Sequence, residues 1–493
     1  MYEPDKRQFG TVWRPADLVF IPGFGLFGPP AEHRQFKPSA TFTLGNLQRT
    51  WKEINEDSNQ FSLNLRFPFE QWTQSEGYLK VGMFRDRVTR EFDQDSYSNF
   101  TDLNAGSPQS YEAGYEEFWS EVFPDQGHVV GPANIDVDYQ GEQGIDAFYS
   151  MVDLPITPWF KLIGGARFES TDLSIVNDAE DDAIWFPPGA SAGVTLNPGD
   201  ADVSFQRDDV LPALAFAYTP MEPLTIRGSY TETVARQTFK ELTPILQQEF
   251  LGGDIFIGNP DLEMSSLRNY DLRVDYTPYQ GSLVSASWFH KDIRDPIEYV
   301  QRVAGGFAFT TPRNYPKGEL TGFEFEARQH LGQFWSSVDG LSVGANATFI
   351  DSQVTLPADE AAIFASPAIQ MPMRNRDMTN TPEHLYNLYV DYNVEQTGTR
   401  MSLFYTVLGD RLIAGAGQSN GNFVPNVYAT DYGTLNFTIS QKLGRYVQLK
   451  FSAKNLTNPS IGQVYRTQFG DVTKTSYKKG IDFSIGLSAE IPF

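Results

Sequence analysis

The chain has 493 residues, and 62 acidic side chains against 38 Lys and Arg give it a net charge of -24. Phosphate binding needs clustered Lys and Arg, so nucleic acid is not expected as a partner. The absence of cysteine excludes disulfides, thiolate metal sites and a cysteine nucleophile. No segment approaches the ~18 consecutive apolar residues that a membrane-spanning helix needs.

The first segment, residues 1–45, is rich in Pro and Gly and is interpreted as part of an external loop. It has no basic stretch followed by an apolar core, so the sequence shows no signal peptide. Strands are expected from residue 46 onward. One alternative assigns an additional strand to residues 39–47, which would let the chain fold as a complete, smaller barrel.

From residue 46 onward, apolar and polar residues alternate in many segments. Phe61, Leu63, Leu65 and Phe67 are apolar, and the residues between them are polar. The same alternation recurs in residues 269–276, 435–440, 447–454 and 481–493. A period of two predicts β-strands with one apolar and one polar face.

The connections between these segments alternate between two lengths. Short connections are expected at residues 154–159, 219–224, 277–281, 395–400 and 442–446. Long ones are expected near residues 95–142, 177–203, 237–265, 300–315, 357–380, 414–429 and 457–478. This pattern is typical of a transmembrane antiparallel outer-membrane β-barrel, whose apolar face meets lipid and whose polar face lines a lumen. A soluble β-sandwich is the alternative, but its strands are usually only ~5–6 residues long.

The segment from Asp95 to Glu142 contains ten acidic residues and no Lys or Arg. Aromatic residues are interleaved with the acids, among them Tyr111, Tyr115, Phe118 and Trp119. One interpretation of this segment is a ligand-binding external loop, in which aromatic rings stack on a flat or sugar-like ligand. The alternative is a solvated surface loop whose acids bind divalent ions among lipopolysaccharide head groups.

Several charged residues fall on the predicted polar faces. We expect them to line the lumen and to pair with one another or with a plug domain, because charges facing a packed interior need partners. They are Arg227, Arg273, Glu324, Glu326 and Arg328. The five histidines have no spacing typical of a metal site, and no catalytic set is evident, so neither a metal, a cofactor nor an enzymatic activity is expected.

The last strand ends on an aromatic residue, Phe493, after a run of alternating apolar residues. This ending resembles the signal that the barrel-assembly machinery of Gram-negative outer membranes recognises. We therefore assign residues 481–493 to a closing strand and Phe493 to its assembly signal.

Several segments resemble TonB-dependent receptors over residues 45–493. TETVARQTFKELTP (231–244) resembles the Arg-Pro-x-Phe strand of the family, with Gln237 in the place of Pro, and IGNPDLE (257–263) resembles the loop that follows. Segments 322–329, 409–421 and 451–458 also occur in the order of the family. The resemblance implies an integral protein of the outer membrane, in contact with lipid and lipopolysaccharide, that is not an enzyme.

The resemblance also implies uptake of a siderophore, cobalamin or an oligosaccharide, driven by the TonB complex through a plug domain. Family members close with roughly 22 strands, whereas about fifteen patterned segments are present here. We therefore expect residues 1–493 to form an incomplete barrel without a plug, unable to perform gated uptake alone. The alternatives are a passive outer-membrane channel and a non-functional receptor fragment.

Overall fold

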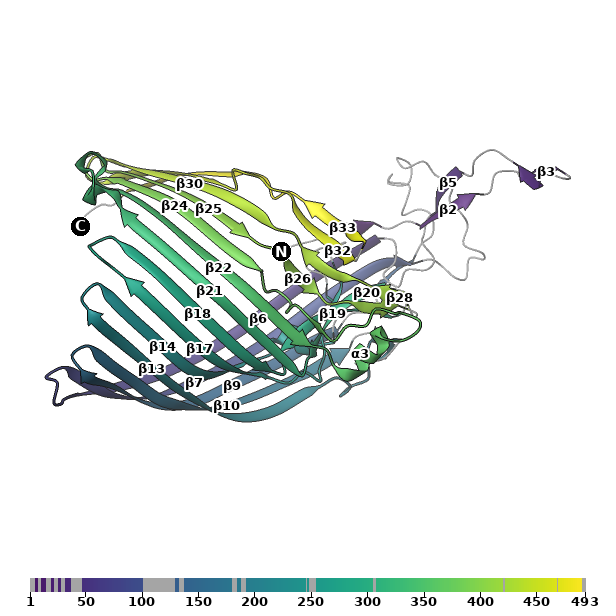
Figure 1. Ribbon diagram of the computed structural model, residues 1–493. Helices are drawn as coiled ribbons and strands as arrows, with labels where there is room; N and C mark the ends of the chain where they lie inside the picture. The colour runs from purple at the N-terminus through teal and green to yellow at the C-terminus, as the bar shows by residue number, and fades with distance from the viewer. Residues whose placement is uncertain are drawn as a thin grey trace.

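The computed structural model describes residues 5–7, 10–14, 19–21, 25–27, 32–36, 47–100, 129–132, 137–179, 184–187, 192–244, 246–247, 254–304, 307–419, 422–467 and 469–489. These residues form an all-β structure built around one large antiparallel sheet (Figure 1). The helices in them are short: α2 (Phe239–Leu242), η2 (Leu331–Gln333), η3 (Ser336–Val338) and α3 (Ala358–Phe364). Within the described ranges, none has the length and apolar character needed to cross a membrane.

The main sheet is a meander in which each long strand is antiparallel to the next one along the chain. Its strands are β6 (Leu47–Glu70), β7 (Glu76–Phe100), β9 (Val137–Thr157), β10 (Phe160–Ala179), β13 (Val203–Met221), β14 (Leu224–Ala235), β17 (Ser265–Tyr276), β18 (Leu283–Arg294), β21 (Lys317–His330), β22 (Leu341–Thr355), β24 (His384–Val394), β25 (Thr399–Leu408), β30 (Tyr432–Leu443), β31 (Val447–Lys454) and β34 (Asp482–Ala489). The five short connections fall where the sequence predicts them.

The strands differ greatly in length. Strands β6 and β7 contain 24 and 25 residues, whereas β31 and β34 contain eight each. A membrane-spanning strand needs only ~9–11 residues. The long strands therefore extend well beyond the length needed to cross a bilayer.

The sheet has one apolar and one polar face. On β17, the apolar side chains of Leu272, Val274 and Tyr276 are 43%, 37% and 45% exposed, while the polar Arg273 and Asp275 alternate with them. The apolar side chains of neighbouring strands lie in register with these, for example Val274 opposite Ala286. A soluble sandwich would bury such a surface in its core, so the exposed apolar face excludes that alternative and is typical of a lipid-facing wall.

Aromatic side chains border the apolar face at both ends of the strands. Towards the long loops lies a row of rings that we call the upper aromatic row: Tyr230, Tyr270, Trp288 and His290, with Tyr230 and Tyr270 5.2 Å apart. Near the short turns, Trp159 packs edge-on against Tyr218 at 5.5 Å. Aromatic girdles of this kind flank the apolar band of outer-membrane barrels.

The main sheet is split between β13 and β14 on the side of the long loops. Strand β13 remains paired with β10 as far as Val203, but its pairing with β14 extends only to Ala213 opposite Thr231. A hollow of about 570 Å³ lies at this split, lined by residues of β13, β14, β17, β18 and the start of β21.

The long connections fold into small sheets of their own. One contains β15 (Leu246–Gln247), β16 (Phe256–Ile257), β19 (Ile297–Ala304) and β20 (Phe307–Asn314), and another contains β26 (Arg411–Ala414), β29 (Asn426–Ala429), β32 (Ile461–Thr467) and β33 (Gly470–Tyr477). Two-stranded pairs are β2 (Gly10–Arg14) with β5 (Glu32–Phe36), β3 (Val19–Ile21) with β4 (Gly25–Phe27), β11 (Ile184–Trp185) with β12 (Val194–Thr195), and β27 (Gly417–Ser419) with β28 (Asn422–Val424). Strands β1 (Asp5–Arg7), β8 (Val129–Pro132) and β23 (Asn375–Arg376) pair with β6, β7 and β22.

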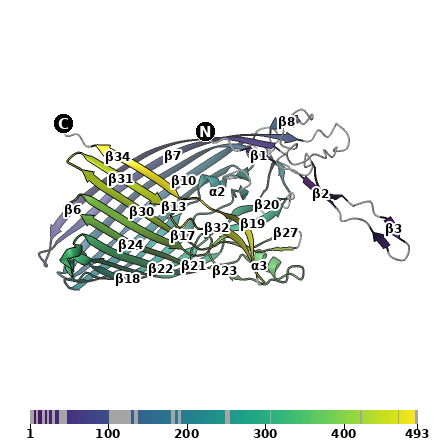
Figure 2. The same cartoon turned by 90° about the horizontal axis from the view of Figure 1, so that it is seen from above.

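Most of these elements gather at the end of the main sheet opposite the short turns (Figures 1 and 2). We call the following set the cap: α2, α3, β15, β16, β19, β20, β23, β26–β29, β32 and β33. Isolated bridges join its parts, such as Val300 with Gly415 and Thr379 with Leu412. The cap is therefore a connected structure over the loop end of the sheet.

Candidate functional site

The cap is anchored to the main sheet by apolar packing. Ile293 at the end of β18 and Val354 at the end of β22 are buried, together with Val300, Tyr315 and Phe364 of the cap. A second cluster packs Phe239 of α2 with residues of β7, β9 and β10, including the stacked rings of Phe92 and Tyr139. These contacts fix the cap relative to the strands that carry it.

A buried ion pair lies at the centre of the cap. The carboxylate of Glu298 on β19 accepts a hydrogen bond from Arg376 Nη1 of β23 at 2.8 Å, and their side chains are 1% and 3% exposed. The backbone N–H of Thr379 donates to the same carboxylate at 3.0 Å. The guanidinium of Arg376 also lies over the ring of Tyr315, 4.7 Å from its centroid. Each buried charge is thus compensated, as burial requires.

The hydrogen bonds continue from this ion pair to α3. The hydroxyl of Tyr315 donates to Glu360 at 2.6 Å, and Arg313 bonds both Glu360 and Asp359. Burial raises the pKa of the Tyr315 hydroxyl above its ordinary range. Helix α3 is therefore held against β20 by charged as well as apolar contacts.

A second polar group of the cap surrounds a small cavity. The hydroxyl of Tyr428 donates to Asp377 at 2.7 Å, and Arg466 pairs with Asp410 at 2.6 Å while lying over the Tyr428 ring. The cavity measures about 230 Å³ and is lined by Ile350, Asp351, Ser352, Asp377, Thr381, Glu383, Asp410, Arg411, Leu412 and Tyr428. Its lining can offer hydrogen bonds to a polar ligand. Among the described residues, no group of three or more His, Asp or Glu is arranged to hold a metal ion.

The two segments that resemble the family motif pack against each other in the cap. Thr238 and Glu241 form a reciprocal capping box at the start of α2, and the backbone N–H of Asn259 donates to the Glu241 carbonyl at 2.7 Å. Gln237 is buried, and its amide donates to the carbonyl of Leu262 at 2.6 Å. The residue that replaces the Pro of the family motif therefore joins both segments through a hydrogen bond that Pro could not make.

The polar face brings three of the five predicted lumen residues together. Arg227 and Arg273 both pair with Asp275, and Arg273 also reaches Glu326 at 3.2 Å. Glu324 and Arg328 are exposed on the same face of β21 and form no ion pair within the described part of the chain. Asp275, only 7% exposed, is the common partner that the sequence analysis did not single out.

The other predicted site residues lie outside the described residues. These are the loop aromatics Tyr111, Tyr115, Phe118 and Trp119 and the terminal Phe493. A long connection was predicted near residues 95–142. The connection between the two long strands is shorter, since β7 continues to Phe100 and β9 begins at Val137.

Comparisons with known proteins identify the family. The family described as TonB dependent receptor-like, beta-barrel, matches residues 2–456. The chain belongs to this family. An outer-membrane location follows from this membership, in agreement with the exposed apolar face and its aromatic borders.

Individual relatives are distant. Two strains of Vibrio cholerae serotype O1 have an iron-regulated outer membrane virulence protein that is 23% and 22% identical to this chain over 253 residues. The matched region covers 49% of this chain and 34% of each Vibrio protein, so the chain spans about a third of the relatives' length in that alignment.

Solved structures share the fold. The ferric-catecholate import receptor Fiu of E. coli K12 has a TM-score of 0.55 and 16% identity, and the siderophore receptor PiuA of Acinetobacter baumannii has 0.55 and 13%. The copper transporter OprC has 0.56 and 12%. Each alignment covers 93% of this chain. It covers 56% of the Fiu chain, 57% of the PiuA chain and 61% of the OprC chain. These similarities establish the shared fold.

Proposed function

We propose that this chain forms the barrel wall and the external loops of a TonB-dependent transporter that takes up a ferric siderophore. The observation that carries the proposal is the combination of a lipid-facing apolar face, a polar face with paired charges, and a cap built from the long connections. The cap lies where a ligand from outside would first be bound, because long loops of outer-membrane barrels are extracellular.

The ligand class is inferred from the relatives. The Vibrio protein is named for iron regulation, and Fiu and PiuA are named for ferric catecholate and siderophore uptake. The similarity to a copper transporter indicates that the fold also serves other cargo. Cobalamin and oligosaccharides remain the alternative ligand classes.

The cavity in the cap, lined by Asp351, Asp377, Glu383 and Asp410, supports a ligand that carries hydrogen-bond donors at its inner end. We assign the outer part of the ligand site to Tyr111, Tyr115, Phe118 and Trp119. This assignment rests on the acidic, aromatic-rich sequence of the segment that contains them. We also propose that Arg227, Arg273, Glu324, Glu326 and Arg328 face the lumen and a plug domain through which the TonB complex acts, and that Phe493 is recognised during barrel assembly.

The proposal is tested by uptake of radiolabelled iron. The receptor that contains this chain is expressed in a Gram-negative strain that lacks its own siderophore receptors, with and without TonB. Uptake of an iron chelate that requires TonB is the expected result. Uptake that continues without TonB would indicate a passive channel, and TonB-dependent uptake of cobalamin or a sugar alone would overturn the ligand class.

The loop aromatics have a separate test. Replacing Tyr111, Tyr115, Phe118 and Trp119 together by Ala should weaken binding of the chelate to whole cells. Trp335→Ala is the matched control, since this ring is 60% exposed near the short turns and should not contact the ligand. Unchanged binding in the fourfold variant would contradict the assignment of these residues.

A further inference from the structure

The polar face of the main sheet changes in character between β21 and β22. On β14, β17 and β21 it carries charged side chains, which we call the charged wall: Arg227, Arg273, Asp275, Glu324, Glu326 and Arg328. On β22, β24, β25 and β30 the same face carries hydroxyl, amide and aromatic side chains, which we call the neutral wall: Asn346, Thr348, Asn387, Tyr389, Phe404, Thr406, Thr434 and Asn436. The pairing registers and the alternation of side chains place both sets on one face.

The two walls lie at the same height of the sheet. One row of directly opposed residues runs through both of them: Asp275, Ser285, Glu326, Asn346, Asn387, Thr406 and Thr434. Between the residues of the neutral wall, Leu388 and Leu403 belong to the apolar face and are 52% and 39% exposed. The neutral wall therefore lies at the depth of the lipid-facing apolar band. A solute that crosses the membrane through the lumen must pass this level.

The side chains of the neutral wall bond one another. The Thr406 hydroxyl donates to Asn387 Oδ1 at 2.8 Å, and Asn387 Nδ2 donates to Asn346 Oδ1 at 2.8 Å. One step further along the strands, the rings of Tyr389 and Phe404 stack with their centroids 5.7 Å apart. Neutral hydrogen bonds of this kind contribute only ~0.5–1.5 kcal/mol each, and they can be exchanged for bonds to water or to a ligand.

The charged wall has a different capacity. Arg227 and Arg273 are paired with Asp275, but Glu324 and Arg328 form no ion pair within the described part of the chain. Charge-assisted hydrogen bonds are about twice as strong as neutral ones, so free charges suit a surface that holds a protein domain. A transport path has the opposite requirement, because each contact must be weak enough for the solute to leave it.

The cap cavity of about 230 Å³ lies at the loop end of the strands that carry the neutral wall. Its lining includes Ser352 of β22, Glu383 just before β24 and Asp410 just after β25. Ser352 is four residues from Thr348 and, by parity, on the same face. The six residues from Ser352 to Asn346 correspond to ~20 Å along the strand. A ligand that leaves the cavity inwards would therefore meet the neutral wall first.

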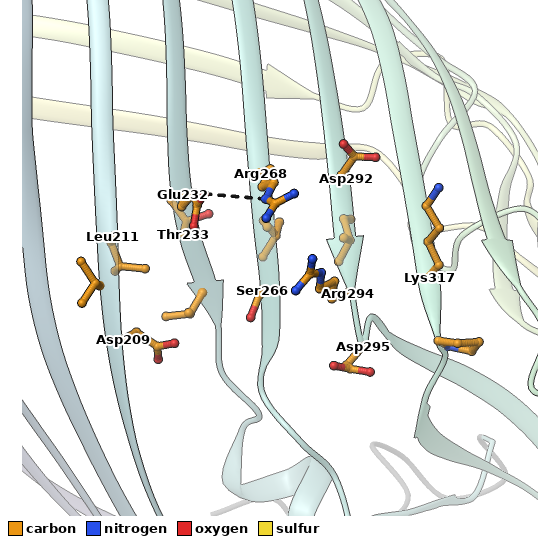
Figure 3. A pocket seen from close by; sticks show the side chains of 15 residues that line it. Asp209, Leu211, Glu232, Thr233, Ser266, Arg268, Asp292, Arg294, Asp295 and Lys317 are labelled. Atoms are coloured by element: carbon orange, nitrogen blue, oxygen red, sulfur yellow. Dashed lines mark ion pairs between the residues drawn. The ribbon is translucent and has the colours of Figure 1, made fainter.

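The hollow at the β13–β14 split is the alternative opening, and it is lined by charge (Figure 3). The charged side chains around it are Asp209, Glu232, Arg268, Asp292, Arg294, Asp295 and Lys317. Glu232 and Arg268 form an ion pair there at 3.6 Å. No residue of β22, β24 or β25 is among the described residues that line this hollow. It therefore shares no strand of the neutral wall.

We propose that the transported ligand crosses the lumen along the neutral wall, while the plug stays bound to the charged wall. The hydroxyl and amide groups exchange hydrogen bonds with the polar atoms of the ligand one after another, and the Tyr389–Phe404 pair contacts its flat groups. This inference rests on the proposed function, because it requires TonB-driven passage past a plug. It adds the side of the lumen on which the passage opens.

The absence of cysteine from this chain allows a direct test. Thr406→Cys places a thiol on the neutral wall. Ser287→Cys on β18 is the matched control, since Ser287 lies between Arg273 and Glu324 of the charged wall. The receptor that contains this chain is expressed with any thiol outside the chain replaced by Ser, in cells with and without TonB. A charged methanethiosulfonate reagent that does not cross lipid is added to the cells, and mass spectrometry follows the labelling.

The thiol of Thr406→Cys should react several times faster in cells with TonB than in cells without it. The thiol of Ser287→Cys should react at the same rate in both. Equal rates with and without TonB for Thr406→Cys, or a TonB-dependent increase confined to Ser287→Cys, would overturn the proposal. This readout does not require knowledge of the transported ligand.

A second readout uses the receptor after it has folded in the membrane. A bulky maleimide dye attached to Thr406→Cys should abolish uptake of a radiolabelled ferric catecholate, relative to the same variant before labelling, without weakening binding at the cell surface. The dye on Ser287→Cys should not reduce uptake. A block by both adducts, or only by the one at Ser287→Cys, would contradict the assignment of the path. Failure of the unlabelled receptor to take up iron counts against the proposed function instead, and the labelling rates then decide the path.

Discussion

Glu298 and Arg376 form an ion pair whose two side chains are almost completely buried, although the residues are 78 positions apart in the sequence. One lies in the connection after β18 and the other in the connection after β22. The pair therefore joins two long loops that would otherwise be held by apolar contacts and a few bridges. Its removal should affect the cap more than the main sheet.

Glu298→Gln should destabilise the cap by about 3–5 kcal/mol, because it leaves the Arg376 guanidinium buried without a counter-charge. We expect faster hydrogen exchange in β19 and β23, measured by mass spectrometry, with the strands of the main sheet unchanged. Arg66→Gln is the control, since Arg66 and its partner Glu76 are 55% and 54% exposed and the pair should contribute little. Equal exchange in wild type and Glu298→Gln would contradict a role of the pair in holding the cap.

The docking of α3 should depend on acid pH. Partial burial alone would raise the pKa of Asp359, but the hydrogen bonds and the positive charge of Arg313, together with backbone hydrogen bonds at the start of α3, outweigh it and hold the pKa below its ordinary value of 3.8. A carboxyl with a lowered pKa stabilises the folded state above its ordinary value, and this contribution is lost as pH falls through the lowered value. Pepsin should therefore cleave near Phe364 faster as the pH drops below 3.8.

The matched variant for this experiment is Asp359→Asn, which cannot titrate. Its cleavage near Phe364, expressed relative to wild type at each pH, should converge with wild type at the acidic end. A constant ratio over the whole range would show that Asp359 does not contribute to the docking of α3.

Gly258→Ala should disturb the contact between the two family-like segments. A Cβ atom at this position would lie 2.0 Å from the carbonyl oxygen of Thr243, so the backbone must move. We expect a loss of about 1–3 kcal/mol, as for other overpacked positions, with proteolysis becoming faster around α2. Gly462→Ala, where the nearest atom would be 3.2 Å away, is the control and should behave like wild type.

Asp275→Asn should weaken the polar face. The substitution removes the negative charge shared by Arg227 and Arg273, and we expect a loss of about 1–3 kcal/mol in the free energy of unfolding. Glu324 lies on the same face and forms no ion pair within the described residues. The substitution Glu324→Gln should therefore not change the free energy of unfolding measurably. Equal midpoints of urea unfolding for the two variants would indicate that the cluster does not stabilise the wall.

The main sheet could be predicted from the sequence because a period of two is a local signal. The alternation at residues 269–276 predicted β17, and TPYQG predicted its turn to β18. The same signal predicts that Glu324 and Arg328 share one face of β21, and both are exposed there. Parity specifies the face of a side chain, but it does not identify its partner on another strand. The role of Asp275 was therefore missed.

The cap could not be predicted in the same way. Its strands contain as few as two residues, such as β16 and β23, and such segments carry no detectable period. The segment 300–315 was expected to be a loop, yet β19 and β20 form a hairpin there. The importance of Glu298 depends on a partner in a distant connection, and only an unusual charge between Ile297 and Tyr299 could have indicated it.

The unequal strand lengths mean that the external rim of the protein is not level. Strands β6 and β7 exceed the bilayer by ~14 residues, which corresponds to roughly 45 Å measured along the strand. Strands β31 and β34, with eight residues each, do not exceed it. A large particle such as an antibody or a phage tail would touch the tall side first, whereas a small solute could enter over the low side. Large particles and small solutes would thus contact different parts of the protein's external surface first.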